Sequence, residues 1–558
     1  MNRTYNDAMF IDTFEHEYTW LNGFMRNVHR SKNKIALIDP VKQTVYTYHT
    51  LNAEVNRFAN ALQKNGIGKN DIVMCVLRNC PEFVFSYIAP RKLGAILLAS
   101  SFNFAANELA ALIDQNKPRV LIYSAIVSQN VEDALKQCAH TPDIVIFADN
   151  LEGKSVSESH IAYDDFVKNA PAEEPERTFR PHIYDEVLRL CTSGTTSLSK
   201  CVPINDINEV LCAHDVIMQY PLCKDDVCLN LTPWFHRGGC HSGGVCAVFY
   251  IGATAIVMRQ FLPKVALEWV KKYGITFMTG TPSCLEMLYR TKHRAKNQGQ
   301  FDLSSLKGIV TMGAPLSRED CIRYMQGLSP RIFNGYGTTE TFWNAFLSPS
   351  DLPEGAGSVG ASCIDDEIRV IRQSSTERVL PDDMVLKDNT ELGEIIVKSP
   401  AKTTYSYSGN PELAEQRFFQ GWTYTGDVGV WDEQGRVTVK GRKDDMIVMS
   451  GENIYPSQVE DALKSCKKVK DCIVTGISDA LRGEAVVAYV VPADKTLTIK
   501  ELYDFCTNCA DLSQYKKPRY FALIAQEEIP LNSTGKKIRR LLKERAEKDF
   551  KAGILQKS

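Results

Sequence analysis

The chain has 558 residues, 44% of them hydrophobic and 24% charged, with a formal net charge of −2 and a pI near 6.6. These values are typical of a globular protein, and the length predicts three or four folding units. Acidic and basic residues nearly balance, and the lysines and arginines are scattered along the chain. We therefore expect no nucleic-acid partner.

The first third of the chain predicts alternating helices and strands. Residues 1–7 contain no apolar segment of signal-peptide length, so we expect a cytoplasmic protein. Apolar residues at helical spacing predict a helix over 51–65, and continuous apolar runs predict buried strands at 71–77, 119–123 and 143–147. A helix is expected at 82–93 between the first two strands. This order is typical of a parallel sheet covered by helices.

A turn rich in hydroxyl groups follows, between predicted strands at 187–190 and 201–204. Residues 190–200 combine six hydroxyl side chains with one glycine and one lysine. Backbone N–H groups, hydroxyls and an ammonium group can together hold a polyphosphate, although the spacing differs from the P-loop pattern. On composition alone a solvated loop is the commoner outcome. The candidate phosphate-binding residues are Thr192, Ser193, Gly194, Thr195, Thr196 and Lys200.

The central region contains a long uncharged stretch, 238–258, that includes His241 and several glycines. It predicts buried strand or helix rather than a membrane span, and we expect no transmembrane segment. The glycine pattern at 355–360 matches a dinucleotide-binding motif, but no strand precedes it and no helical pattern follows. We therefore interpret it as a chance match.

The seventeen cysteines are expected to be reduced thiols, many of them in the core, since the number is odd and no secretion signal is found. Cys506 and Cys509 form a single pair without a second pair at zinc spacing, so helix packing is the simpler interpretation.

Five further motifs follow the hydroxyl-rich turn in a fixed order: 334–340 (NGYGTTE), 424–427 (YTGD), 441–445 (GRKDD), 450–453 (SGEN) and 530–536 (PLNSTGK). With that turn they closely resemble the adenylate-forming superfamily, which includes acyl- and aryl-CoA synthetases, luciferases and the adenylation domains of peptide synthetases. The resemblance covers residues from about 185 to 540. Its cofactors and co-substrates are ATP, Mg²⁺ and coenzyme A.

The resemblance implies roles for individual residues. Thr339 would bond the α-phosphate, Glu340 would hold Mg²⁺, and Asp427 would accept from both ribose hydroxyls. Arg442 would lie on the ribose or phosphate side. Lys536 would be the adenylation lysine, brought in by one orientation of a mobile lid. The nucleotide site would also include Ala314, Pro315, Asn334, Gly335, Tyr336, Gly337 and Thr338, and the coenzyme A side would include Ser450, Gly451 and Glu452.

The acyl site is expected beside the aromatic stretch 233–239, which contains His236, together with Thr281, Gly313 and Gly337. Acetate-specific relatives have a bulky tryptophan at the position of Gly337, so we expect an acid larger than acetate. His236, Cys240 and His241 also offer metal-ligating atoms, but a packed or gating histidine is the simpler interpretation. Two departures stand out: most relatives have glycine, proline and glycine where this chain has Ser197, Ser199 and Cys201, and many have histidine where it has Asp206.

The predicted fold is α/β, with a large N-terminal body of α/β layers and a barrel-like subdomain over 1–443, and a small mobile α+β lid over 444–558. The predicted function is an ATP-dependent carboxylic acid–CoA ligase that forms an acyl-adenylate and then acyl-CoA, AMP and pyrophosphate. The alternatives are an enzyme that loads a carrier-protein phosphopantetheine and a non-catalytic binding homologue. The oligomeric state stays open, a homo-oligomer included.

Overall fold

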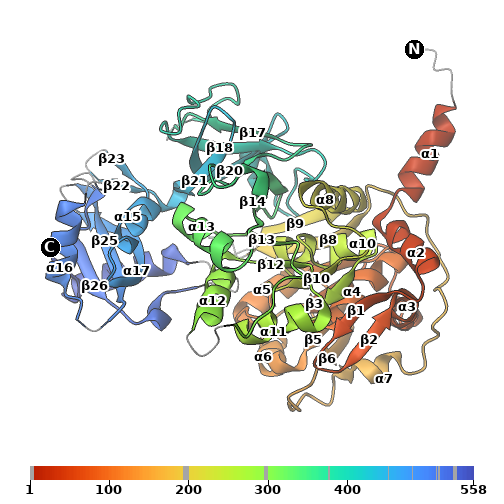
Figure 1. Ribbon diagram of the computed structural model, residues 1–558. Coiled ribbons are helices and arrows are strands. Elements are labelled where there is room, and N and C mark those ends of the chain that lie inside the picture. The colour runs from red at the N-terminus through yellow and green to blue at the C-terminus, as the bar shows by residue number, and fades with distance from the viewer. Residues whose placement is uncertain are drawn as a thin grey trace. The chain divides into compact units, whose positions relative to one another are not determined.

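A computed structural model describes residues 6–192, 200–294, 299–374, 377–449, 452–479, 482–494, 496–509, 512, 516–531 and 537–557 (Figure 1). The chain divides into two compact units. Unit 1 contains residues 1–368 and 397–423, and unit 2 contains residues 369–396 and 424–558. The predicted domain boundary between residues 443 and 444 stays a prediction.

Within the described residues, unit 1 contains a nine-stranded sheet in the order β16-β15-β14-β13-β12-β10-β11-β1-β2. Its inner strands, from β14 to β1, run parallel, whereas β2, β15 and β16 pair antiparallel at the edges. The strands are β1 (Ile35–Asp39), β2 (Thr44–Thr47), β10 (Val227–Asn230), β11 (Thr254–Ile256), β12 (Phe277–Gly280), β13 (Gly308–Met312), β14 (Ile332–Thr338), β15 (Phe342–Leu347) and β16 (Ala361–Ser362).

A second sheet of unit 1 has, in the described part, seven strands in the order β7-β6-β5-β3-β4-β8-β9. All its pairs are parallel except β8 with β9. The strands are β3 (Ile72–Val76), β4 (Ile96–Ala99), β5 (Val120–Ser124), β6 (Ile144–Ala148), β7 (Ile161–Ala162), β8 (Glu186–Thr192) and β9 (Lys200–Asn205). The strands predicted at 71–77, 119–123, 143–147, 187–190 and 201–204 are therefore confirmed.

A layer of helices contacts both sheets and forms the largest core. α4 packs on β3 and β4 and α8 on β9, while α3 and α10 contact β1 and β11 of the other sheet. These helices are α2 (Trp20–Arg30), α3 (Tyr48–Lys64), α4 (Pro81–Leu93), α8 (Asp206–Gln219) and α10 (Val245–Ile251). Burying apolar helix faces against two sheets gives the layered α/β body expected from the sequence.

The outer faces of the two sheets are covered separately (Figure 1). A second core lies under α11 (Pro263–Tyr273), α12 (Pro282–His293) and α13 (Arg318–Gly327) on the nine-stranded sheet. A third lies under α5 (Ala106–Asn116) and α6 (Ser128–Gln137) on the seven-stranded sheet. The remaining helices of unit 1 are α1 (Asp7–Glu17), α7 (Tyr163–Val167), α9 (Arg237–His241) and α14 (Pro411–Arg417), with 3-10 turns η1 (Ala125–Val127) and η3 (Pro349–Asp351).

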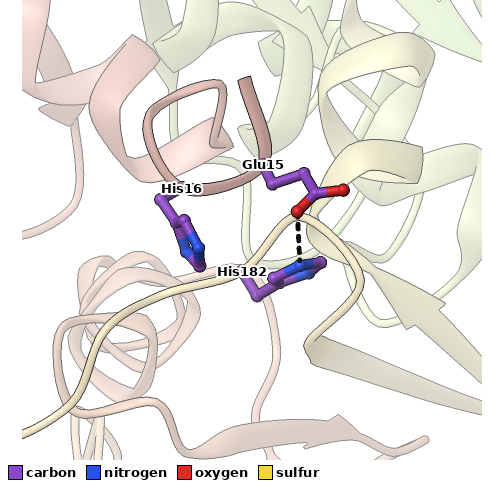
Figure 2. A group of neighbouring side chains, drawn as sticks. All are labelled: Glu15, His16 and His182. Atoms are coloured by element: carbon purple, nitrogen blue, oxygen red, sulfur yellow. Dashed lines mark ion pairs between the residues drawn. The ribbon is translucent and has the colours of Figure 1, made fainter. Parts of the chain in front are cut away.

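Helix α1 has no buried residue and is attached to the following chain by polar contacts near its carboxyl end. Figure 2 shows Glu15 and His16 of α1 beside His182, with Glu15 Oε2 and His182 Nε2 3.4 Å apart. His16 Nδ1 lies 2.5 Å from the carbonyl oxygen of Pro181, and the two histidine rings meet edge to face. These contacts hold α1 to the segment that leads into β8.

A five-stranded sheet accounts for the predicted barrel-like region. Its described strands follow the order β17-β18-β20-β19, with β21 beside β20. They are β17 (Glu367–Ile371), β18 (Gly393–Lys398), β19 (Phe418–Phe419), β20 (Trp422–Trp431) and β21 (Val437–Arg442), and the 3-10 turn η4 (Lys443–Asp445) follows. The β segments predicted at 367–371 and 394–397 are confirmed.

The part of unit 2 that follows residue 445 is an α+β fold. Its described strands form a six-stranded sheet, β23-β22-β25-β26-β27 with β24 beside β25, and helices cover it with two small cores. The strands are β22 (Ile447–Met449), β23 (Glu452–Ile454), β24 (Val469–Asp479), β25 (Gly483–Pro492), β26 (Tyr520–Leu523) and β27 (Gln556–Lys557). The helices are α15 (Pro456–Lys464), α16 (Ile499–Asn508) and α17 (Arg539–Lys551), with the 3-10 turn η6 (Gln526–Glu528). Cys506 of α16 is buried in one core, as the helix-packing interpretation predicts.

No helix of the described residues is long and apolar enough to cross a membrane.

Candidate active site

Several candidate residues of unit 1 lie at the carboxyl edge of the nine-stranded sheet. β10, β12, β13 and β14 run parallel, so Thr281 after β12 and Gly313 after β13 lie at the same edge as the end of β14. Gly335 of β14 pairs directly with Met312, the last residue of β13. Open α/β sheets bind ligands at this edge, because the connecting loops diverge there.

Strand β14 carries the predicted adenine-side residues. Asn334 and Tyr336, two positions apart, share one face of the strand and are 1% and 9% exposed. The Asn334 side-chain amide donates to the carbonyl of Ser358 over 3.2 Å. A Cβ at Gly335 would lie 2.6 Å from the indole nitrogen of Trp343, so only glycine lets the strand pass this ring. Asn334 and Tyr336 are therefore both buried on this strand.

Gly337 corrects one sequence inference. The strand register shifts between Tyr336 and Gly337, and a Cβ at Gly337 would lie only 1.4 Å from the carbonyl oxygen of Phe342. The reasoning that this glycine leaves pocket volume open is wrong, because its missing side chain permits a close approach of two backbone segments. Gly313 does face space: only the Thr281 methyl carbon lies near a Cβ built there, 3.9 Å away. Ala314 and Pro315 follow it, half-buried and exposed.

The turn after β14 presents Thr339 and Glu340, both half-buried. The hydroxyl of Tyr407, which is itself buried, donates to Glu340 Oε1 over 2.5 Å. Such a contact fixes the direction of a carboxylate. Mg²⁺ is usually bound by one or two protein carboxylates together with phosphate oxygens and water, so a single oriented carboxylate fits this ion.

A chain of buried polar side chains lies beneath this turn. Thr338 Oγ1 contacts Thr341 Oγ1 at 2.9 Å, and the Thr341 hydroxyl donates to Asn344 Oδ1 over 2.6 Å. The Asn344 amide donates to Asp366 Oδ2 over 3.1 Å, and Lys402 Nζ lies 2.7 Å from the same oxygen. The turn that carries Thr339 and Glu340 is therefore connected to a buried lysine.

Lys402 is 2% exposed and contacts two carboxylates, Asp366 and, at 3.0 Å, Asp215. Burial lowers the pKa of its ammonium group, but Asp215 and Asp366 more than offset this, and the pKa lies above its usual value. It also donates to the carbonyl of Trp343. The sequence inference missed Lys402, although it is the only charged residue between Lys398 and Glu412.

His236 lies half-buried at the start of α9, just after β10, with its ring 4.3 Å from that of Phe235. Burial lowers the pKa of its imidazole to about 4, so the ring is neutral at pH 7. The metal alternative named for His236, Cys240 and His241 does not assemble in the described residues.

His241 instead joins Glu209 and Cys246 in the core. Its Nε2 lies 2.5 Å from Glu209 Oε1, and Arg91 binds the other oxygen of Glu209 at 2.7 Å. Burial raises the pKa of Glu209, but His241 and Arg91 outweigh it and hold the pKa well below its usual range. We interpret this group, like that of Figure 2, as a structural ion-pair cluster.

The hydroxyl-rich turn leaves the carboxyl end of β8 and returns as β9, as predicted. Residues Ser193 to Thr196 lie outside the described residues, and Thr192 pairs with Lys200 at the base of the turn. Cys191 and Cys201, the next pair, are joined by a disulfide. The expectation of reduced thiols is wrong for this pair, because antiparallel pairing places two cysteines directly opposite each other.

Asp206, which replaces a common histidine, accepts from the backbone N–H of Trp20 over 2.5 Å and is buried at the start of α8. Burial raises its pKa to about 6. Its position supports a structural role.

Unit 2 contains the second group of candidates. Asp427 of β20 and Arg442 of β21 are directly paired, and Arg442 Nη1 lies 2.9 Å from Asp427 Oδ1. Arg442 also donates to the carbonyl of Thr425 over 2.9 Å. Ser450, Gly451 and Lys536 lie outside the described residues, and Glu452 begins β23.

Comparison with known proteins decides the family. Residues 24–407 match the family described as AMP-binding enzyme, and residues 458–536 match the AMP-binding enzyme C-terminal domain. The chain belongs to the AMP-binding enzyme family. A crotonobetaine/carnitine–CoA ligase from Escherichia coli is 30% identical over 516 residues, with 89% of this chain and 93% of the relative covered.

Solved structures agree. An anthranilate CoA ligase in complex with anthranoyl-AMP has a TM-score of 0.84 at 23% identity, covering 97% of this chain and 99% of its own. The o-succinylbenzoate CoA synthetase of Bacillus subtilis, in complex with its acyl-adenylate, has a TM-score of 0.79 at 26% identity, covering 94% and 98%. The chain is thus an enzyme of the AMP-forming acid–CoA ligase family, as the sequence predicted.

Proposed function

We propose that this enzyme converts a carboxylic acid larger than acetate into its CoA thioester in two half-reactions, with the residues of units 1 and 2 in the roles that their motifs imply. A free carboxylate reacts poorly with a thiol because oxide would have to leave. ATP supplies the missing leaving group: the acid displaces pyrophosphate to form an acyl-adenylate, and the thiol of CoA then displaces AMP. The carboxyl-edge cluster of unit 1, with its oriented Glu340, carries the proposal.

The first half-reaction depends on positioning and charge, because phosphoryl transfer needs little covalent help from the protein. Glu340, held by Tyr407, would bind Mg²⁺, and Thr339 beside it would donate to the α-phosphate. Asn334 and Tyr336 would border the adenine from β14. Asp427 would accept from the ribose hydroxyls, and its contact with Arg442 orients the carboxylate. Lys200 and the turn before it would hold the other phosphates.

The acid is proposed to lie beside Gly313, Thr281 and His236. The open space at Gly313 supports an acyl group larger than acetate, and the neutral imidazole of His236 adds no charge to it. This replaces Gly337 as the residue that leaves room for the acid. Ser450, Gly451 and Glu452 would serve the coenzyme A half-reaction, and Lys536 the adenylation half-reaction.

A panel of acids tests the substrate class: acetate, butyrate, octanoate, benzoate and crotonobetaine, with pyrophosphate release measured with and without CoA. We expect CoA-dependent thioester formation with at least one of the larger acids and little with acetate. A preference for acetate would contradict the assignment of Gly313, and turnover with a phosphopantetheine carrier alone would contradict CoA as the acceptor.

The variant Lys536→Ala tests the site. It should reduce acyl-adenylate formation by about a hundredfold or more, as expected when one positioned donor to a charged transition state is lost. Conversion of supplied acyl-adenylate to thioester should be nearly unchanged. Lys537→Ala is the matched control, because the adjacent Lys537 binds Asp471 at 2.7 Å and should affect stability rather than one half-reaction. Equal losses in both half-reactions would refute the role of Lys536.

A further inference from the structure

Two cysteines close the base of the proposed phosphate loop. Cys191 of β8 and Cys201 of β9 are direct partners in the antiparallel pair, with their Cα atoms 4.1 Å apart, and a disulfide joins them. The next pair outward is Thr192 with Lys200, and the loop 193–199 follows. The bond therefore fixes the two strands one residue before the groups that would meet phosphate.

The two sulfur atoms have different surroundings. Cys191 is half-buried, whereas Cys201 is 1% exposed, in the core under α5. The amide of Asn116 lies within 3.6 Å of the Cys201 sulfur and can donate to it. In the described residues the other fifteen cysteines are free thiols, and eleven of these are buried. Within the described residues, this is the pair whose sulfur atoms are joined, and one of the two cysteines is half-buried.

We propose that Cys191 and Cys201 form a reversible redox modification site, with a low-molecular-weight disulfide as oxidant, that controls how tightly the phosphate loop binds ATP. The Cys191 thiolate attacks the oxidant RSSR, forming a mixed disulfide and releasing one RS⁻. The Cys201 thiolate then attacks the Cys191 sulfur, forming the intramolecular bond and releasing the second RS⁻. Two thiols are oxidised to one disulfide, RSSR is reduced to two RSH, and a dithiol reductant reverses the change.

The effect on ATP follows from the strand pairing and rests on the proposed function of the loop. Ordering residues at a binding site costs conformational entropy, and this cost reduces the affinity for the ligand. The disulfide holds Thr192 and Lys200 in register before ATP arrives. The oxidised enzyme should therefore bind ATP more tightly than the reduced enzyme, by about three- to tenfold if one or two residues at the base are ordered in advance.

The bond is tested first by mapping it. Full-length enzyme is prepared under reducing, oxygen-free conditions, equilibrated with oxidised glutathione, alkylated and digested without reduction. Trypsin cleaves after Lys200, so the two cysteines fall on separate peptides, 190–200 and 201–224, which only the bond joins. Fragmentation must assign the link to Cys201, because Cys212 and Cys223 lie on the same peptide. Absence of this link after oxidation would overturn the proposal.

The dissociation constant of ATP is then measured by calorimetry for the oxidised and reduced forms, and for Cys191→Ser and Cys201→Ala. We expect a three- to tenfold difference in the wild type and none in either variant, both of which should resemble the reduced enzyme. Cys506→Ser, which removes a buried thiol of unit 2, is the matched control and should keep the difference.

Equal ATP affinity in the two wild-type forms, or tighter binding by the reduced form, would overturn the inference while leaving the proposed function intact. If neither form binds ATP although the link is mapped, the proposed function fails, and the control of ATP binding fails with it. The two failures are therefore distinguishable.

Discussion

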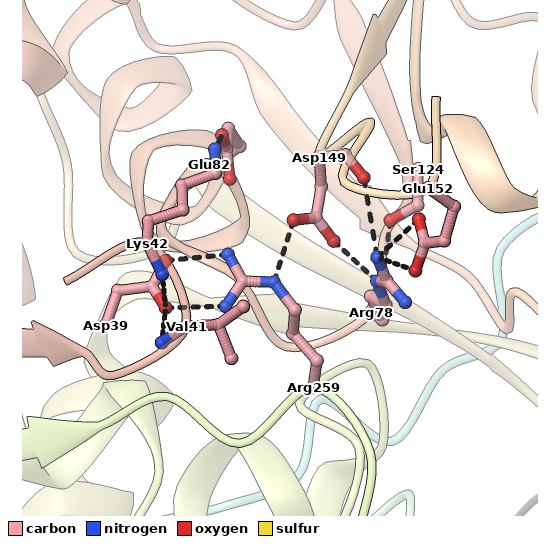
Figure 3. Close-up of polar contacts among 9 residues, drawn as sticks. All are labelled: Asp39, Val41, Lys42, Arg78, Glu82, Ser124, Asp149, Glu152 and Arg259. Carbon is pink, nitrogen blue, oxygen red and sulfur yellow. Dashed lines mark hydrogen bonds and ion pairs between the residues drawn. The ribbon is translucent and has the colours of Figure 1, made fainter. Parts of the chain in front are cut away.

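Two buried charge networks of unit 1 use the same interaction for different purposes. In one, Lys402 is surrounded by carboxylates, and Asp366 continues through polar side chains to the turn that carries Glu340. In the other, Arg259 binds Asp39 with two contacts of 2.6 Å and Asp149 at 2.8 Å (Figure 3). The two networks are alike in their burial and in their ion pairs. Only the residues next to each network distinguish a role in the site from a role in holding the fold.

The Arg259 network joins the sheets. Asp39 ends β1 and Arg259 follows β11 in the nine-stranded sheet, while Arg78 follows β3 and Asp149 follows β6 in the seven-stranded sheet. Arg78 Nε lies 2.5 Å from Asp149, as Figure 3 shows. Although burial raises the pKa of Asp39, Arg259 holds it below its usual value. A buried ion pair therefore says little about function until the residues beyond it are known.

The largest effect is expected for Lys402→Met. Removing the ammonium leaves Asp215 and Asp366 buried without their partner, which typically costs about 3–5 kcal/mol of unfolding free energy. The Asn344–Thr341 chain also loses its anchor, so acyl-adenylate formation per folded molecule should fall about a hundredfold. Urea unfolding and pyrophosphate release, measured at a temperature where the variant is folded, check both. Full activity of the folded fraction would show that Lys402 does not position the turn.

The variant Arg259→Leu should lose about as much stability as Lys402→Met but much less activity. Asp39 would be left buried without its cationic partner, at a cost of about 3–5 kcal/mol, because the penalty is that of an uncompensated buried charge, while Asp149 would keep its contact with Arg78. Activity per folded molecule should stay within about twofold of the wild type, since the ion pairs hold strands rather than the turn. A loss of activity comparable to that of Lys402→Met would remove the distinction between the two networks.

Much of the fold and part of the site followed from local sequence patterns. The apolar run 72–76 predicted a buried strand, and it forms one. The resemblance named Gly313 and Thr281 together with the motif over 334–340, and the parallel order of β12, β13 and β14 brings them to one edge of the sheet. Lys402 could not be assigned its partners, because Asp215 lies 187 residues away in the chain. Such pairing is decided by packing of distant segments rather than by sequence spacing.

Two further points needed the structure for different reasons. Cys191 and Cys201 flanked the predicted hairpin turn symmetrically, so the sequence contained a signal, but the odd cysteine number and lack of a secretion signal favoured thiols. Gly337 was misinterpreted because a register shift in β14 turns its missing side chain toward the backbone of Phe342. A sequence motif gives no sign of a one-residue register shift in a strand.

A milder change sharpens the comparison within the Lys402 chain. Thr341→Val keeps the shape of a fully buried side chain but removes the hydroxyl between Thr338 and Asn344. We expect about 1–2 kcal/mol of lost stability and a severalfold loss of adenylation, since one buried hydrogen bond is broken. Thr254→Val is the matched control: it removes a buried hydroxyl that donates to the Ile35 carbonyl over 2.7 Å and should cost stability alone. Equal activity of the two variants would contradict a positioning chain.

The smallest effect concerns pH and His236. Its imidazole has a pKa lowered to about 4 by burial, against about 6.5 in the unfolded chain, so the unfolded state binds more protons between these values. The part of the unfolding free energy that depends on the neutral His236 ring is therefore fully present above pH 6.5 and declines as the pH falls toward 4. Because the ring is half-buried, we expect a decline of about 1 kcal/mol. Urea unfolding at pH 7.5 and pH 4.5 should show a smaller pH-dependent loss in His236→Asn than in the wild type. Identical losses would mean that His236 titrates as an exposed histidine and that water freely reaches the proposed acid site beside it.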